Sequence, residues 1–161
     1  VDAPGVLAVR LGADGTGAEQ LWCEAPGSLL KPHLDADVIA QKRHFPRMNG
    51  RAVFRHAIQT LERELRALLK AHDLDDPEAR RALWLVPHQA NRHINEHVAQ
   101  ALGLDPSRVI HTIEGFGNTT AASIPMALDV ARGQGLVGPG SLLLHAAFGS
   151  GFTWGTALVR L

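Results

Sequence analysis

Short apolar runs alternate with segments of helical period through the second half of the chain, and this order restricts the possible folds most strongly. Runs of strand length occupy residues 82–86, 108–113, 141–147 and 152–160. Residues 90–102 and 119–131, which lie between the first three runs, repeat their apolar side chains with the period of a helix. Strands joined through helices lie parallel, because the helix returns the chain to the end of the sheet at which the preceding strand began. Such crossovers are right-handed. The sequence therefore predicts an α/β fold with a mainly parallel sheet, helices on both faces and a closing antiparallel strand.

The first half of the chain predicts one strand, a loop-rich connection and one long helix. A strand is expected over residues 5–11, and a second, short strand near residues 21–23. A helix is expected over residues 49–72, because its apolar side chains recur on one face and Asn49 can cap its first turn. The opposite face of this helix carries the basic residues Arg51, Arg55, Arg63, Arg66 and Lys70. An ordinary solvated surface is the simplest explanation of those charges.

Three polar features follow three of the predicted strands. His88 comes after the strand 82–86, Asn118 follows the strand 108–113 through a glycine-rich stretch, and the turn Gly149-Ser150-Gly151 follows the strand 141–147. Because the carboxyl ends of neighbouring parallel strands meet at one edge of a sheet, we expect these features to converge. An imidazole, an amide and the N–H groups of a turn can all donate hydrogen bonds to an oxygen that gains negative charge.

Each of these features also has a purely structural interpretation. A histidine after a strand is more often structural than catalytic, Asn118 can cap the helix that follows it, and residues 149–151 can form a plain hairpin turn. Their coincidence at three strand ends is what favours chemistry.

His93 and His97 raise the possibility of a metal site, because two histidines four residues apart on a helix suit zinc. The segment lacks a glutamate beside the first histidine, and no cysteine or carboxylate cluster supplies a third ligand. Two surface histidines are the simpler interpretation, and no metal is expected.

The balance of charges excludes partners that are attracted by a strong overall field. Sixteen basic residues match sixteen acidic ones, so nothing favours nucleic acid or a membrane surface as a partner. No apolar run reaches the roughly 18–20 residues of a membrane span, and the first residues lack the pattern of a signal peptide. The single cysteine, Cys23, excludes an internal disulfide. A cytoplasmic protein of one domain is therefore expected.

Three sequence motifs carry a family resemblance. They are Pro87-His-Gln-Ala-Asn91, then Gly117-Asn-Thr119 followed by Ala121-Ala-Ser123, and finally Phe148-Gly-Ser-Gly-Phe-Thr-Trp-Gly155. A further segment, Arg47-Met-Asn-Gly-Arg-Ala-Val-Phe54, is similar to the start of a helix in the same family. Together they resemble the C-terminal half of β-ketoacyl-acyl-carrier-protein synthase III, a thiolase-fold condensing enzyme that initiates fatty-acid synthesis. The resemblance runs over nearly the whole chain.

The resemblance implies a decarboxylative Claisen condensation of malonyl-acyl carrier protein with an acyl-coenzyme A primer, in fatty-acid or related polyketide synthesis. His88 and Asn118 match the residues that donate hydrogen bonds to the thioester oxygen as it gains charge. The Ser150 backbone N–H matches the donor to the acyl-thioester oxygen, although many members have glycine at this position. No cofactor is implied, because coenzyme A and phosphopantetheine thioesters are the substrates.

The same resemblance implies where substrates and partners bind. The substrate-binding positions match Phe148, Asn91, Gly50 and Phe54. The contacts with the acyl carrier protein or coenzyme A match Arg51, Arg55 and Arg92. The usual basic residue two places after Asn91 is His93 here, so carrier docking is expected to differ in detail. A homodimer of the complete enzyme is also implied.

The resemblance finally implies an incomplete enzyme, because the family's nucleophilic cysteine lies at a helix start in the N-terminal half. Cys23 precedes Pro26-Gly27 without a helical pattern, and we expect it to be a small structural core residue. The chain also begins at Val1, which suggests a fragment. Residues 1–40 would be the last strand and connection from the N-terminal half, and residues 41–161 the C-terminal thiolase-like half-domain. The nucleophile would come from the absent half, attached or separate.

A non-condensing acyltransferase, or a catalytically inactive partner subunit with the same fold, is the alternative. The pair His88 and Asn118 favours condensation, because an uncharged amide suits an enolate better than an acidic group would.

Overall fold

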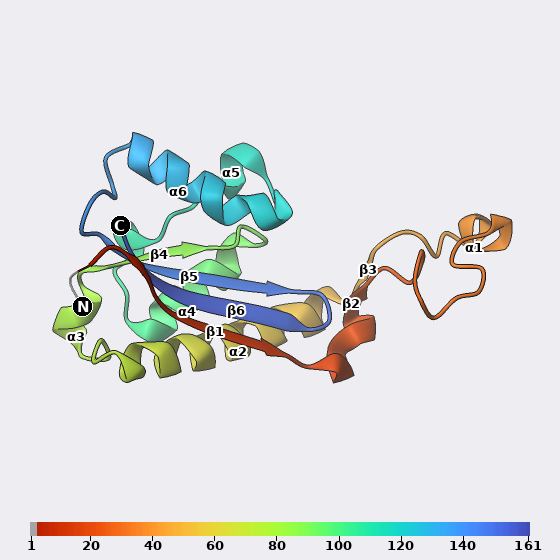
Figure 1. Ribbon diagram of the computed structural model, residues 1–161, viewed down its shortest axis with the longest axis horizontal. Coiled ribbons are helices and arrows are strands. Elements are labelled where there is room, and N and C mark those ends of the chain that lie inside the picture. The colour runs from red at the N-terminus through yellow and green to blue at the C-terminus, as the bar shows by residue number, and fades with distance from the viewer. Residues whose placement is uncertain (1–2) are drawn as a thin grey trace.

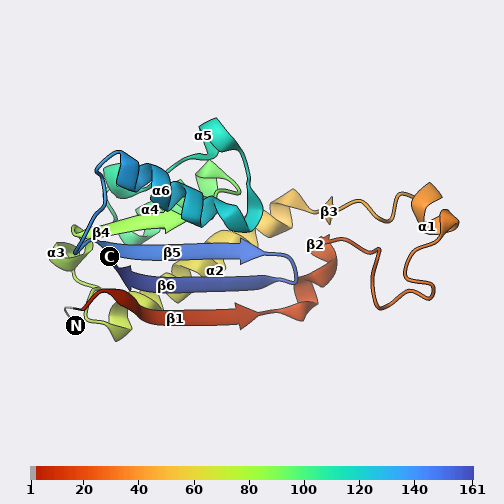
Figure 2. The same cartoon turned by 45° about the horizontal axis from the view of Figure 1, so that its top comes forward.

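A four-stranded sheet in the order β1, β6, β5, β4 forms the centre of the computed structural model, which describes residues 3–161. Its strands are β1 (Gly5–Ala13), β4 (Leu83–Pro87), β5 (Leu142–Gly149) and β6 (Thr153–Arg160). β4 pairs with β5 in parallel, whereas β6 is antiparallel to both β5 and β1. Three of these strands therefore point one way and β6 points the other (Figure 2). This arrangement confirms the mainly parallel sheet with a closing antiparallel strand.

Helices cover both faces of this sheet (Figure 1). The helices α2 (Gly50–Ala71) and α4 (Arg92–Leu102) pack on one face, and α6 (Ser123–Gly133) packs on the other. A short helix, α3 (Pro77–Arg80), connects α2 to β4. None of the helices that residues 3–161 form is long and apolar enough to cross a membrane.

The central strands are buried on both faces, which explains their continuous apolar sequences. Leu85 and Leu144 pack in the layer under α2 and α4. Their neighbours Val86 and Leu143 pack in the layer under α6, against its small side chains Ala127 and Ala131. Successive strand residues point to opposite faces, so each apolar run supplies both layers.

Side-chain caps fix the starts of the helices α2 and α4. The Asn49 side chain accepts a hydrogen bond from the Ala52 N–H, which confirms the predicted start of α2. Asn91 caps α4 by accepting from the His93 N–H, so this helix begins two residues later than predicted. Gly103 ends α4 with a φ of 68°, a conformation that glycine adopts without a steric penalty.

The strand predicted over residues 108–113 is wrong. The chain there passes from a 3-10 turn at Pro106–Arg108 to the short helix α5 (Ile113–Phe116). Val109 forms an isolated parallel bridge with Leu85, and the Ile110 N–H donates to the Leu85 carbonyl at 2.9 Å. The next groups in register, the Ile110 carbonyl and the Thr112 N–H, are bound by the Gln89 side chain instead. The Gln89 side chain therefore binds the backbone groups that a continuing β4 would have paired.

The helix predicted over residues 119–131 starts later than expected. A 3-10 turn at Thr120–Ala122 precedes α6, which begins at Ser123. Thr120 has a φ of 52°, in the left-handed region, so the α-helix cannot extend back through this residue. Pro125 is the third residue of α6, where its missing N–H removes no hydrogen bond within the helix.

Residues 23–46 project from the sheet as an arm that carries α1 (Ala36–Ala40) (Figure 1). At its base, β2 (Leu21–Trp22) pairs with β3 (Arg47–Met48), which confirms the short strand expected near residues 21–23. Cys23 is exposed at this base, so the prediction of a core cysteine is wrong. Its thiol instead lies 3.0 Å from the Ala25 carbonyl, because the chain has already left the sheet at this point.

Candidate active site

Two cavities meet at the carboxyl ends of β4 and β5. The first, of about 310 Å³, lies between these strand ends and the helices α2 and α4. Its lining includes Gly50, Phe54, His88, Asn91, Asn118 and Phe148. The second, of about 620 Å³, is lined by parts of β1, α6 and the β5–β6 hairpin, Ser150 among them. His88, Asn118 and Phe148 line both cavities, so the structure brings these predicted residues together on a shared wall.

The backbone of His88 extends the central pairing of the sheet by one residue. Its N–H donates to the Ala146 carbonyl at 2.7 Å. Its carbonyl accepts from the side-chain amide of Asn95 in α4, at 3.3 Å. The imidazole therefore projects from a backbone that is held on both sides, which keeps its position defined relative to both cavities.

The ring of His88 contacts Ser123, the first residue of α6. Nδ1 of His88 lies 2.6 Å from the Ser123 hydroxyl oxygen. That oxygen also accepts a hydrogen bond from the Gln89 N–H, at 3.2 Å. Because an oxygen already engaged as an acceptor is well placed to donate its own proton, we assign the Ser123 hydroxyl as the donor to Nδ1. A neutral imidazole that accepts at Nδ1 carries its proton on Nε2, which then serves as a donor.

Burial lowers the pKa of His88 below its ordinary value, because desolvation disfavours the charged ring. The neutral form is therefore favoured near pH 7. Such a ring is an uncharged donor, like the amide of Asn118.

Asn118 makes a local turn contact that also orients its amide. Its Oδ1 accepts from the Thr120 N–H at 2.9 Å. Because its oxygen accepts from the Thr120 N–H, the amide still has its NH₂ group as a donor, and Asn118 lines both cavities. The turn role and the donor role are therefore compatible, and the turn contact does not exclude chemistry at this residue.

The turn at residues 149–151 is a hairpin between β5 and β6, as its structural interpretation predicted. It also places Ser150 on the wall of the second cavity. Just before the turn, Phe148 packs against Phe152 with ring centres 5.0 Å apart and stacks parallel to Trp154 at 6.5 Å. These rings form a rigid apolar wall next to His88 and Asn118.

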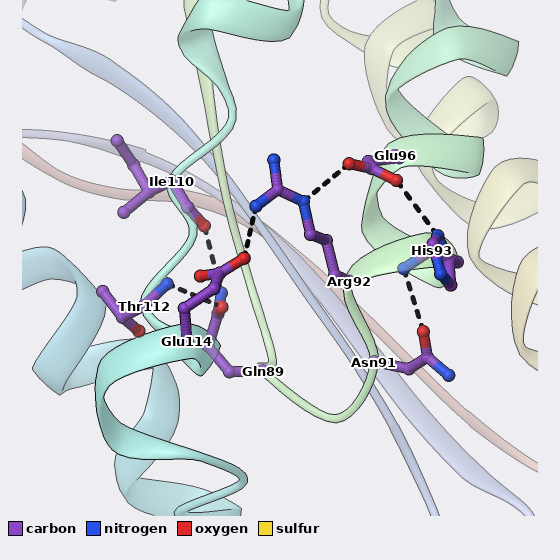
Figure 3. Close-up of polar contacts among 8 residues, drawn as sticks. All are labelled: Gln89, Asn91, Arg92, His93, Glu96, Ile110, Thr112 and Glu114. Atoms are coloured by element: carbon purple, nitrogen blue, oxygen red, sulfur yellow. Dashed lines mark hydrogen bonds and ion pairs between the residues drawn. The ribbon is translucent and has the colours of Figure 1, made fainter.

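The three predicted cationic contacts differ in their surroundings. Arg51 and Arg55 are exposed on the first turns of α2, one residue after the cavity residues Gly50 and Phe54. Neither has an acidic partner within 4 Å among residues 3–161. Arg92 is paired instead with Glu96 of α4 and with Glu114 of α5 (Figure 3). Its charge is therefore already compensated within the chain.

No metal centre is found in the described part of the chain, where no three His, Cys, Asp or Glu side chains are arranged to hold an ion. His93 interacts with Glu96 on the surface of α4, at 3.2 Å.

Sequence reasoning assigned no role to Ser123, Gln89 or Asn95, which hold His88 in place. Ser123 lies 35 residues from His88 and meets it only after folding. Gln89 follows directly after His88 at the end of an apolar run, and this position was the one available signal.

Known proteins are similar to this chain over nearly its whole length. The family described as 3-oxoacyl-acyl-carrier-protein (ACP) synthase III C terminal matches residues 78–161. The chain is 43% identical over 159 residues to the β-ketoacyl-acyl-carrier-protein synthase III of Rhodospirillum rubrum, across 98% of this chain and 44% of the relative. It is 39% identical over 166 residues to the enzyme of the same name from Erythrobacter litoralis, across 99% of this chain and 46% of the relative.

Solved structures share the same architecture. A 3-oxoacyl-acyl-carrier-protein synthase III from Pseudomonas aeruginosa superposes with a TM-score of 0.81 at 34% identity, over 96% of this chain and 45% of that one. The priming β-ketosynthase of a polyketide pathway superposes with a TM-score of 0.80 at 30% identity, over 100% of this chain and 46% of that one. The chain spans less than half the length of these relatives. Together with the site at the ends of β4 and β5, these similarities show that the chain belongs to the 3-oxoacyl-acyl-carrier-protein synthase III family and represents its C-terminal half.

Proposed function

We propose that this chain carries the enolate-stabilising part of a condensing enzyme that joins malonyl-acyl carrier protein to an acyl primer. The observation that carries the proposal is the pairing of two uncharged donors, His88 and Asn118, on a wall shared by two cavities. One cavity can hold the incoming malonyl thioester while the other holds the acyl group.

In the proposed reaction, the bond between the malonyl carboxylate and its methylene carbon breaks and carbon dioxide leaves. The electron pair passes into the thioester and gives an enolate, whose oxygen bears the negative charge. Nε2–H of His88 and the amide of Asn118 donate to that oxygen. Because these donors are held in place before the charge develops, they stabilise the transition state more than the ground state.

The enolate carbon then attacks the acyl thioester, and a thiolate leaves. We propose that the Ser150 N–H holds the acyl-thioester oxygen during this step. Its position in the hairpin on the second cavity supports the assignment. A backbone group supplies the donor, so serine in place of glycine is compatible with the role.

We propose that the acylated cysteine is supplied by an N-terminal half, covalently attached or as a separate chain. Cys23 is a poor candidate, because it is exposed at the base of the arm and lines neither cavity. On β1, Val9 and Leu11 are 54% and 80% exposed, and Leu11 borders the second cavity. Exposed apolar side chains beside a reaction site are what a covering domain would bury.

The division at about residue 40 remains part of this proposal, with residues 1–40 as the connection from the N-terminal half. We also propose a homodimer of the complete enzyme. A cytoplasmic location is proposed as well, since the substrates would be coenzyme A and carrier-protein thioesters. The proposed chemistry relies on side chains and backbone donors, and no resident cofactor takes part.

The first cavity suits the pantetheine arm of such a thioester. Gly50, Phe54 and Asn91 line it, and Arg51 and Arg55 stand next to it on α2. Exposed arginines without acidic partners attract an acidic carrier protein or the phosphates of coenzyme A. Arg92 is a weaker contact in this proposal, because Glu96 and Glu114 already compensate its charge.

Reversing the charge of Arg51 or Arg55 is expected to weaken binding of the carrier protein without slowing the chemical step. In a protein that joins this chain to an N-terminal half from a relative, Arg51→Glu and Arg55→Glu should each raise KM for malonyl-acyl carrier protein by about tenfold at low salt, with kcat nearly unchanged. Arg51 lies in the first turn of α2, where an acidic side chain is favourable, so loss of α2 would not explain the result at this position. Lys70→Glu at the far end of α2 is the control. Equal KM values in all these proteins would contradict the carrier-contact assignment.

The proposed function is tested by joining this chain to the N-terminal half of the Rhodospirillum rubrum relative. The joined protein should release carbon dioxide from malonyl-acyl carrier protein and form ketoacyl product, whereas this chain alone should do neither. Ketoacyl product from the chain alone would show that Cys23 or another group is the nucleophile, and a Cys23→Ser variant would distinguish the two. Acyl transfer by the joined protein without decarboxylation would support a non-condensing acyltransferase and contradict the proposal.

A further inference from the structure

Gln89 is a fully buried amide whose hydrogen-bonding groups all have partners. Its Nε2 donates to the Pro87 carbonyl at 2.9 Å and to the Ile110 carbonyl at 3.0 Å. Its Oε1 accepts from the Thr112 N–H at 3.0 Å. Two carbonyls on one side and one N–H on the other fix the orientation of the amide. Gln89 has no exposed surface, so none of these bonds competes with water.

These contacts hold two segments together beyond the last backbone hydrogen bond between them, from the Ile110 N–H to the Leu85 carbonyl. β4 ends at Pro87, and the segment after Val109 does not continue as a strand. The Gln89 side chain bridges this gap by binding Ile110 and Thr112 (Figure 3). It also binds the Pro87 carbonyl at the end of β4. Its backbone N–H also binds the Ser123 hydroxyl, which in turn contacts His88. One residue therefore links the end of β4, residues 110–112 and the start of α6.

Gln89 connects the two segments that carry the proposed donors. His88 directly precedes Gln89, and residues 110–112 lead through α5 to Gly117 and Asn118. On the surface, Arg92 and Glu114 pair across the same two segments (Figure 3). That outer pair is solvated and salt-sensitive, whereas the Gln89 contacts are buried.

We propose that Gln89 is a positioning residue that sets the separation of His88 and Asn118 for enolate stabilisation, an inference that rests on the proposed function. Two donors stabilise one developing charge only when both reach the same oxygen. A change of about 1 Å in such a geometry can reduce the rate about 10²-fold. Gln89 touches no substrate and acts through the two segments that it joins.

The test uses the joined protein and compares Gln89→Met with Gln100→Met. Methionine has a similar length but no amide, and Gln100 is an exposed glutamine on α4. We expect Gln89→Met to lower kcat for malonyl decarboxylation about 10²-fold while KM changes by about twofold or less. Gln100→Met should match wild type. If Gln89→Met lowers the melting temperature but leaves kcat near wild type, Gln89 is only structural and the inference is overturned.

A second variant, Gln89→Glu, covers the case in which Gln89→Met does not fold. The introduced carboxyl keeps an acceptor for Thr112 but faces two carbonyl oxygens, so its pKa is raised and its neutral form can donate to one of them. The ratio of its kcat to that of wild type should therefore rise as the pH falls from about 8 to about 6. A ratio that stays constant with pH would contradict a role for the amide donors.

Failure of the inference is distinguishable from failure of the proposed function. A wild-type joined protein that does not decarboxylate contradicts the proposed function itself. In that case a crystal structure of the Gln89→Met joined protein decides the positioning question. A shift of residues 110–118 relative to His88 supports it, and an unchanged separation of the His88 and Asn118 side chains overturns it.

Discussion

Replacing His88 by alanine in the joined enzyme is expected to reduce malonyl decarboxylation about 10²- to 10³-fold, the usual effect of removing one donor to a developing oxyanion. KM for malonyl-acyl carrier protein should change little, because the lost hydrogen bond strengthens only as charge develops. The measurement is release of carbon dioxide from labelled malonyl-acyl carrier protein under saturating conditions.

The fold should tolerate this change. The His88 backbone contacts with Ala146 and Asn95 do not involve the ring, so the variant keeps them. His97→Ala, at an exposed position on α4, is the matched control and should behave as wild type. Equal decarboxylation by wild type and His88→Ala would show that the role assigned to His88 is wrong.

Replacing Asn118 is expected to have an effect of similar size, and two variants separate its two contacts. Asn118→Ala removes both the amide donor and the oxygen that accepts from the Thr120 N–H. Asn118→Asp keeps that oxygen and therefore the turn, but it replaces the donor by a negative charge. We expect both to lower decarboxylation about 10²- to 10³-fold, with the aspartate variant at least as impaired, because like charges repel at the enolate oxygen.

This comparison gives a clear alternative outcome. If Asn118 matters only as a turn residue, Asn118→Asp will retain nearly full activity, and the donor role will be excluded. Gln100→Glu adds the same charge at an exposed position of α4 and controls for an effect of net charge. Thermal unfolding of each variant shows whether the chain remains folded.

The sequence predicted the strands at 82–86 and 141–147 because they are buried on both faces and read as continuous apolar runs. It failed at residues 108–113, where a run that contains Val109, Ile110 and Ile113 forms no strand. The difference lies in Gln89, whose side chain binds the groups that a strand would have paired. The local pattern of apolar residues predicts burial, but it does not predict which group forms a hydrogen bond with each backbone N–H or carbonyl.

The wrong prediction for Cys23 also arises because burial depends on tertiary structure. Lone cysteines are usually buried, and a local pattern does not show at which residue the chain leaves the sheet. Residues 23–46 project as an arm, so the thiol is exposed (Figure 1). Whether a residue is covered depends on where distant segments run, which a local pattern does not contain.

The sequence by itself determined the strands near residues 5–11, 82–86, 141–147 and 152–160, the long helices between them and the positions of His88, Asn118 and the 149–151 turn, because local periodicity and turn chemistry are encoded residue by residue. Only the tertiary structure decided that His88 and Asn118 share one wall, that Ser123 contacts the histidine ring and that Arg92 is neutralised by Glu96 and Glu114. These relations join residues that lie far apart in the chain. They exist only once the packing of α4, α5 and α6 around the sheet has brought the residues together.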